Sequence, residues 1–328
     1  MQSNRLERAK YTLIGCCFGD AMGMPTEGMS YQSIHQQYPN GITTFMESIN
    51  ADYTSRKFTA GSITDDSIHT ILLIDAIKKG HGKVTSEGYM NELLAWYESS
   101  TIADQVIGPS TLNAIQQFKN GTPLDQLGKF AVTNGSLMKI SPIGIIQDYR
   151  DKPTLIDAVI SVCQMTHGSN VALSSAVVIA YLVSLYLRSD AKLEDLFLHT
   201  YEILQACEKI GFDFASPSLV ERIKIAEKIS ESELSKEVKI KKIYDVIGTG
   251  VGCIETLPAV LAIVKISDAD IYECGCICAS IGGDTDTLGA IACAICGTIH
   301  PTLEQLYVET LERVNHIDFQ QLINKLID

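Results

Sequence analysis

The sequence predicts an all-α fold in one domain over residues 1–328. Apolar residues recur with the period of a helix along most of the chain, and the alternation typical of strands is nearly absent. No linker rich in Pro, Gly or Ser divides the chain. With 328 residues, 46% of them hydrophobic, the chain is long enough for one large core. We expect small residues (Ala, Gly, Ser and Cys) to let the central helices approach closely.

The periodicity predicts helices in chain order, and each helix has a recognisable apolar side. The first helix places Leu6, Ala9 and Leu13 on one face and is expected to end at the glycines that begin with Gly19. Residues 176–187 are too short to span a membrane and predict a buried core helix. Residues 221–242 are dense in Lys and Glu and predict solvated surface helices. The expected ranges are 5–18, 65–79, 85–98, 171–187, 192–210, 217–229, 234–247, 253–265, 268–279, 286–299 and 302–314.

Charge and cysteine content narrow the class of protein. The net charge of −13 repels nucleic-acid phosphates and anionic lipid, so we expect neither general nucleic-acid binding nor membrane binding. Most of the ten cysteines lie in apolar helical runs, which favours reduced, buried thiols in a cytoplasmic protein. Cys274, Cys276 and Cys278 are closely spaced, but no nearby His has zinc-finger spacing, so zinc is not expected there. We expect no targeting segment.

Two short acidic turns carry the strongest chemical signal. Thr64-Asp65-Asp66 and Asp284-Thr285-Asp286-Thr287 each stand at a predicted helix start. Their carboxylates and hydroxyls are hard oxygen ligands, which suit Mg²⁺, Mn²⁺ or Ca²⁺. Either turn alone is explained by acids that complement a helix dipole, and Ser62 or Thr64 can cap the helix that follows the first turn. The pair favours a shared two-metal hydrolytic site, and ligands from both ends of the chain argue for one domain.

Three further turns carry polar groups whose function the residues leave open. Glu27 follows the glycines of the first helix, although an exposed loop glutamate is the simpler interpretation. Gly135 and Ser136 form a turn whose backbone amides suit an anion, although an ordinary turn looks the same. His167 precedes the buried helix, where a helix cap or a hydrogen-bonded core group is the alternative to catalysis.

Taken together, these motifs resemble the ADP-ribosylglycohydrolases, which include the dinitrogenase-reductase-activating glycohydrolases and the J1-crystallin-like proteins. The resemblance covers nearly the whole chain in order. It runs through residues 15–27, 64–66, 107–111, 134–142, 166–167, 248–250 and 255–258 to 282–289. It implies a single compact orthogonal helical bundle with two Mg²⁺ (or Mn²⁺) ions.

The resemblance also assigns roles to individual residues. Glu27 matches the acidic residue beside the metals, which acts as acid, as base or to orient water. Lys139 stands where arginine is expected in many relatives. A lysine keeps the positive charge but lacks the planar guanidinium group that can bind through two parallel hydrogen bonds. The implied metal ligands are Thr64, Asp65, Asp66, Asp284, Asp286 and Thr287. The implied contacts to ADP-ribose are Gly108, Ser110, Gly135, Ser136 and His167.

The activity implied by the resemblance is hydrolysis of the glycosidic bond between ADP-ribose and a modified protein side chain, through an oxocarbenium-like transition state. Arginine is the expected acceptor by family analogy, and the expected partner is an ADP-ribosylated protein or another ADP-ribose conjugate. Two alternatives remain. One is a two-metal phosphoester or diphosphate hydrolase acting on free ADP-ribose-like nucleotides. The other is a non-catalytic, crystallin-like relative, against which the complete set of implied ligands and Glu27 argue.

Overall fold

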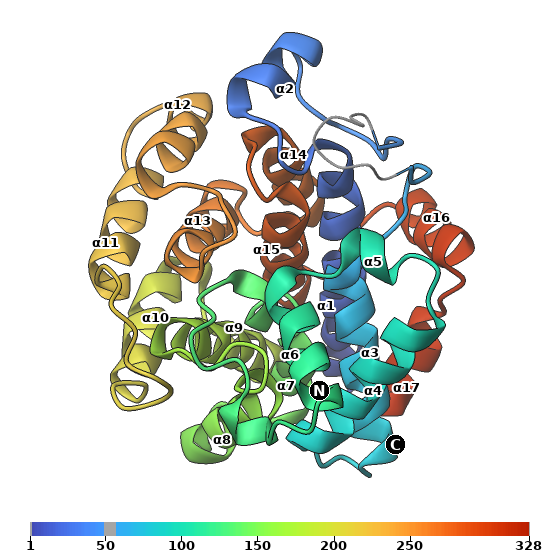
Figure 1. The fold of residues 1–328 in the computed structure, drawn as a ribbon. Helices are drawn as coiled ribbons and strands as arrows, with labels where there is room; N and C mark the ends of the chain where they lie inside the picture. The colour runs from blue at the N-terminus through green and yellow to red at the C-terminus, as the bar shows by residue number, and fades with distance from the viewer. Residues whose placement is uncertain (1, 49–56, 328) are drawn as a thin grey trace.

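The computed structural model describes residues 2–48 and 57–327, and within them all regular structure is helical (Figure 1). Two isolated bridges, Thr133 with Gly252 and Ser169 with Phe212, are the only strand-like pairings of the described residues. The all-α class predicted from the sequence is therefore confirmed.

Seventeen α-helices make up the described part of the chain, joined by short loops and single turns. They are α1 (Gln2–Gly23), α2 (Tyr31–Gln37), α3 (Asp65–Lys79), α4 (Ser86–Ser99), α5 (Ala103–Val106), α6 (Pro109–Lys119), α7 (Ser141–Ile146), α8 (Lys152–Cys163), α9 (Asn170–Arg188), α10 (Leu196–Gln205), α11 (Leu219–Ser230), α12 (Lys236–Lys242), α13 (Cys253–Ile266), α14 (Ile271–Ile281), α15 (Thr285–Ile299), α16 (Gln305–Asn315) and α17 (Phe319–Ile327). The short 3-10 turn η3 (Asn134–Ser136) precedes α7.

The centre of the molecule is an antiparallel pair, α1 and α15, whose backbones touch (Figure 1). A Cβ atom added to Gly15 would lie 2.1 Å from the carbonyl oxygen of Cys293, and one added to Gly19 would lie 1.9 Å from that of Gly289. Such distances are far below contact distance, so only glycine fits. The expected close approach of small-residue helices is confirmed.

Helix α1 ends at Gly23, among the glycines where the sequence predicted its end, but it runs through Gly19 and past the expected bound at residue 18. Glycine costs an isolated helix about 1 kcal/mol per residue relative to alanine, which is why the sequence indicates an end there. Packing against α15 outweighs this cost.

Helix α9 crosses the core beside this pair. Its length and apolar composition would suffice to cross a membrane, but 89% of its most apolar window is buried inside the protein. This confirms the buried core helix expected around residues 176–187. At the surface, no residue of α12 is buried, which agrees with the solvated helices expected over 221–242.

The sequence missed several short helices and overextended others. Helices α2, α5, α6, α7, α8 and α17 were not predicted. Proline stands in the first turn of α6, α7 and α8, and short pieces that begin at proline resemble loops in a sequence. The predicted helix 234–247 is wrong in its second half, because α12 ends at Lys242 and a π-helical turn, η5 (Ile243–Ile247), follows. The predicted helix 192–210 shortens to α10.

All ten cysteines are free thiols, nine of them buried and Cys276 half-buried. Among the described residues, the groups of three or more possible ligand atoms that lie within 4.8 Å of one another consist of carboxylates. The described side-chain groups that could hold a metal ion are therefore acidic.

Candidate metal centre and its cavity

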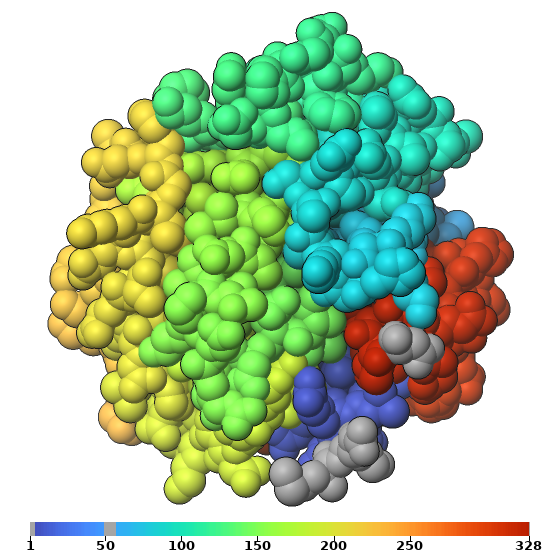
Figure 2. All heavy atoms as spheres, turned by 90° about the horizontal axis from the view of Figure 1, so that it is seen from below, coloured from blue at the N-terminus to red at the C-terminus, as the bar shows by residue number. Residues whose placement is uncertain are grey.

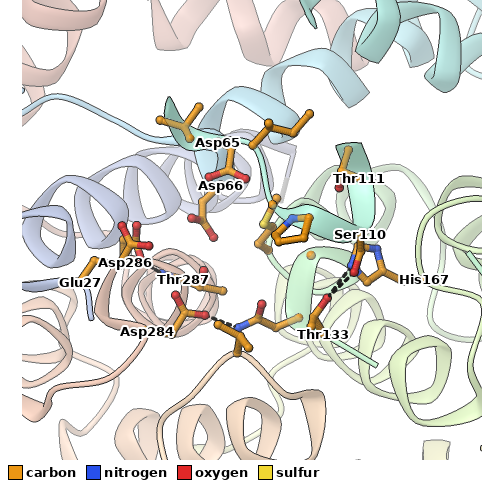
Figure 3. Close-up of a pocket in the computed structure, with 18 residues that line it drawn as sticks. Glu27, Asp65, Asp66, Ser110, Thr111, Thr133, His167, Asp284, Asp286 and Thr287 are labelled. Carbon is orange, nitrogen blue, oxygen red and sulfur yellow. Dashed lines mark hydrogen bonds between the residues drawn. The ribbon is translucent and has the colours of Figure 1, made fainter. Parts of the chain in front are cut away.

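One cavity of about 310 Å³ lies where the N-termini of α3, α6 and α15 meet η3 (Figure 3). Figure 3 shows Glu27, Asp284 and Asp286 on one side, Asp65 and Asp66 above them, and a polar group with His167 opposite. The residues that line the cavity are Glu27, Asp65, Asp66, Val106, Ile107, Gly108, Pro109, Ser110, Thr111, Thr133, Asn134, Gly135, Met138, His167, Val251, Asp284, Asp286 and Thr287.

The two acidic turns meet, as the sequence predicted. Carboxylate oxygens of Asp66 and Asp286, with one of Asp20, all lie within 4.8 Å of one another. A second group joins Glu27 to Asp284 and Asp286. Asp286 belongs to both groups, so the two clusters are adjacent. The clusters also bring Glu27 from the loop after α1 next to residues more than 250 positions away in sequence.

Asp20 is the acid that the sequence analysis missed. It lies on α1, is fully buried, and accepts hydrogen bonds from the backbone amides of Thr64 (3.0 Å) and Ser67 (3.1 Å). It also accepts from the hydroxyls of Thr64 (2.9 Å) and Ser67 (2.6 Å). Asp20 therefore caps α3 from another helix, whereas the predicted cap is wrong, because the Thr64 side chain makes no cap bond of its own. The signal for Asp20 that the sequence did contain was an acidic residue inside an otherwise apolar helical run.

Burial and mutual repulsion dominate the electrostatics of the cluster. Burial raises the pKa of Asp20 to about 7, and the nearby Asp286 carboxylate adds to the shift. Burial, and then Asp286, also raise the pKa values of Asp66 and Asp284 well above those of ordinary carboxyl groups. Each shift shows that a negative charge is disfavoured here without a compensating positive charge.

The donor set fits a hard divalent cation. Oδ1 of Asp66 is buried and has no hydrogen-bond partner among the described residues. No Lys or Arg is among the described residues that line the cavity. A buried carboxylate oxygen without a partner is costly, and a cation bound by carboxylates and hydroxyls would remove that cost. These observations support the ability of the cluster to hold metal.

Thr64 and Ser136 are the two predicted site residues whose side chains lie off the cavity. Thr64 is fully buried beneath it, with its hydroxyl directed at Asp20 (2.9 Å) and Asp66 (3.2 Å). The Ser136 hydroxyl instead donates to the carbonyl of Ala172 (3.2 Å), so its side chain faces the core. The other predicted residues line the cavity, and Asn134, which was not predicted as a ligand, donates to Asp284 at 2.5 Å.

A chain of hydrogen bonds forms the side opposite the acids. The Thr133 hydroxyl lies 3.2 Å from that of Ser110 and 2.9 Å from Nε2 of His167 (Figure 3). Nδ1 of His167 lies 2.9 Å from the hydroxyl of Thr166. Burial, and then Lys139, lower the pKa of His167 well below its usual value, so the ring is neutral. His167 is thus a hydrogen-bonded group that also borders the cavity.

Gly135 makes room for this histidine. A Cβ atom on Gly135 would lie 2.6 Å from Cε1 of His167. Lys139 does not border the cavity: it is fully buried, its Nζ donates to Thr166 (3.3 Å) and sits 5.0 Å from the centre of the Tyr89 ring. The presence of lysine in place of arginine at this position therefore removes no direct contact with the cavity.

Comparisons with known proteins point to one family. The family model for ADP-ribosylglycohydrolase matches residues 1–328. An uncharacterized protein of Escherichia coli K12, YegU, is 30% identical over 98% of this chain and 97% of its own length. A protein of Xenopus tropicalis named ADP-ribosylhydrolase ARH3 is 22% identical, over 92% of this chain and 89% of its own. A solved structure titled as an ADP-ribosylglycohydrolase-related protein complex superposes with a TM-score of 0.71 at 20% identity, covering 99% of this chain and 98% of the other.

Proposed function

The chain belongs to the ADP-ribosylglycohydrolase family, and we propose that it hydrolyses the glycosidic bond between ADP-ribose and a modified protein side chain. The observation that carries this proposal is the convergence of both acidic turns and Glu27 on one cavity. Family membership supports a hydrolase that acts on ADP-ribose conjugates. Arginine as the acceptor rests on analogy with the family and is part of the proposal.

The proposal includes two Mg²⁺ or Mn²⁺ ions, held by Thr64, Asp65, Asp66, Asp284, Asp286 and Thr287. Support comes from the purely hard-oxygen donor set, from the partnerless oxygen of Asp66 and from the metal dependence of the family. When bound, such ions supply positive potential and Lewis acidity to the ribose end of the substrate. They would offset the repulsion that raises the pKa values of Asp66 and Asp284.

Glu27 is the residue proposed to move a proton. Its carboxylate stands with Asp284 and Asp286 at the edge of the cavity and is half-buried, so water can reach it. Hydrolysis forms a bond from a water oxygen to the ribose C1″, breaks the bond to the acceptor and delivers a proton to the leaving group. Glu27 either accepts the proton of that water or donates to the leaving group.

The opposite side of the cavity is proposed to hold the rest of ADP-ribose. Ser110, Thr133 and His167 offer a connected set of hydrogen-bonding groups there. Helix α6 begins at Pro109 after Gly108, and its free amides and dipole favour a phosphate. Gly135 offers a further backbone amide on η3. The cytoplasmic location and the single domain expected from the sequence stay predictions.

The test is a hydrolysis panel with arginine-linked and serine-linked ADP-ribose, each in Mg²⁺, Mn²⁺ and EDTA. Free ADP-ribose as the product, formed with metal and absent in EDTA, supports the proposal. The acceptor that is turned over identifies the linkage. AMP with ribose phosphate as products would instead show diphosphate hydrolysis and overturn the glycosidic assignment.

A further inference from the structure

Four of the seven arginines of the chain line a single pocket. Arg5, Arg8, Arg150 and Arg188 border a space of about 600 Å³, here called the arginine pocket, together with Asn4, Leu187, Ser189 and Asp190. This concentration is unexpected in a protein with a net charge of −13. Figure 2 views this end of the molecule, where the first turns of α1 (blue) reach the surface.

The arginine pocket lies at the other end of α1 from the acidic cavity. Arg5 and Asp20 are fifteen positions apart on this helix, which corresponds to about 22 Å at 1.5 Å per residue. The residues that line the two spaces are entirely different. The two sites can therefore be studied independently.

Two of the arginines have structural partners, which is the simplest explanation for their presence. Arg188 donates to the carbonyls of Gly144 (3.0 Å) and Ile145 (2.6 Å) near the end of α7. Arg8 donates to the carbonyl of Tyr186 (2.6 Å) near the end of α9. Cations stabilise helix C-termini in this way. However, Nε of Arg8 is buried without a hydrogen-bond partner among the described residues, so helix capping leaves a donor unsatisfied.

The other two arginines make no such bonds to helix ends. Arg150 pairs with Asp148 through two parallel contacts, and Arg5 has no ion pair among the described residues. Arg5 and Arg150 are both exposed to solvent. Counting Asp148 and Asp190, four guanidinium groups face two carboxylates, an excess of two positive charges. Burial, and then Arg5, lower the pKa of Arg188 to about 10, as expected where like charges are held together.

We propose that the arginine pocket binds a small phosphate-bearing anion, of which a diphosphate is the simplest form. Guanidinium groups pair with phosphate oxygens through two parallel hydrogen bonds, and such an anion would neutralise the excess charge. The pocket volume falls within the range of small-molecule sites. A nucleotide and an inorganic polyphosphate share this chemistry.

The first experiment is calorimetric titration of the full chain with inorganic pyrophosphate at low salt in EDTA, which keeps metal-bound phosphate out of the acidic cavity. We expect saturable binding of one pyrophosphate per chain. The double variant Arg5→Gln/Arg150→Gln removes exposed charges and no helix-end contact, and it should weaken binding by at least about tenfold. Arg313→Gln, an exposed arginine on α16, is the matched control and should bind as the wild type does.

A second measurement needs no variant. Phenylglyoxal modifies accessible arginines, and peptide mass spectrometry should show that pyrophosphate protects Arg5 and Arg150 but not Arg313. Competition by ADP would identify a nucleotide as a source of the anion, and its failure to compete would identify inorganic phosphate. No saturable binding, equal binding by the double variant, or binding only of phosphatidylserine vesicles through these arginines would overturn the proposal. None of these readouts depends on hydrolysis, so the proposed function stands or falls separately.

Discussion

The buried acids of the cavity differ in what their oxygens contact, and this difference separates their roles. Both oxygens of Asp20 accept bonds from Thr64 and Ser67, so Asp20 positions the start of α3. Asp66, two residues beyond Thr64, keeps one oxygen without a partner among the described residues. We infer that Asp20 orients the site and that Asp66 is one of the acids available to a cation.

Glu27→Gln tests acid–base chemistry separately from metal binding. Glutamine keeps the size of the side chain but transfers no proton at neutral pH, so turnover should fall by about 10²–10⁴-fold while ADP-ribose still binds. Single-turnover hydrolysis and calorimetry measure the two effects.

Asp286→Ala is the contrasting variant, because Asp286 belongs to both carboxylate groups. Loss of this carboxylate should lower metal-dependent ADP-ribose affinity as well as turnover. Near wild-type turnover by Glu27→Gln would show that Glu27 is not the acid–base residue.

Asp20→Asn tests the cap that the sequence did not reveal. At about pH 8, above its pKa of about 7, Asp20 accepts from four donor groups, and an asparagine NH₂ group must face at least one of them. In saturating Mg²⁺, which offsets the repulsion from Asp286, the unfolding free energy should drop by about 2–4 kcal/mol, the cost of unsatisfied buried donors near a lost charge. Urea denaturation measures it. Asp75→Asn, which removes a partly exposed pair with Lys325, is the control and should cost under about 1 kcal/mol.

At the scale of elements, the contact between α1 and α15 sets the position of the site. Gly23 packs against the carbonyl of Thr285, and Gly19 packs against that of Gly289. This register places Asp20 of α1 beside Asp286 in the first turn of α15. Helix α3 then joins through its own N-terminus, held by Asp20. The position of the acidic cluster is therefore a consequence of how three helix ends pack.

Gly19→Ala should disrupt this contact. The added methyl would lie 1.9 Å from a backbone oxygen of Gly289, and neither central helix can move without disturbing the core. We expect a loss of more than about 3 kcal/mol or a failure to accumulate in soluble form. Thermal melts and soluble yield measure both outcomes. Gly88→Ala in α4, where the nearest atom is a side-chain oxygen of Thr85 at 3.1 Å, should stay within about 0.5 kcal/mol of the wild type. A soluble Gly19→Ala protein with unchanged melting would refute this account.

For the whole molecule, stability should depend on pH and metal together. Without metal, the raised pKa values of Asp20, Asp66 and Asp284 mean that the folded state holds protons more tightly than the unfolded chain. Their stabilising contribution is complete below the ordinary carboxyl pKa of 3.8 and is lost as pH rises through the folded-state pKa values, about 7 for Asp20.

The metal-free protein should consequently melt several degrees lower at about pH 8 than at about pH 5.5. Cations compete with those protons, so Mg²⁺ or Mn²⁺ should raise the melting temperature more at the higher pH. Differential scanning fluorimetry with and without EDTA measures both trends. Asp286→Ala should reduce the metal-dependent rise, and an equal rise at both pH values in the wild type would contradict the prediction.

Local patterns in the sequence determined the class of the fold and the main chemical groups. Helical periodicity predicted the long helices, because a helix repeats every 3.6 residues whatever surrounds it. Acids at the starts of α3 and α15 indicated the cluster, and small residues predicted a close approach of the central helices. Short helices such as α7 were not predicted. The six residues of α7, which begin at Ser141-Pro142, show too little periodicity to be distinguished from a loop in the sequence.

Only the tertiary structure decided which side chains reach the cavity. Asp20 bonds to Thr64 across 44 positions of sequence, and Thr64 approaches Asp286 across 222, so neither contact has a local signal. The same packing turns the Ser136 hydroxyl toward Ala172, although the resemblance implied a contact between Ser136 and ADP-ribose, and it buries Lys139 beside Tyr89. The direction of a side chain depends on the register between packed helices, and that register is set by close contacts such as Gly19 on Gly289.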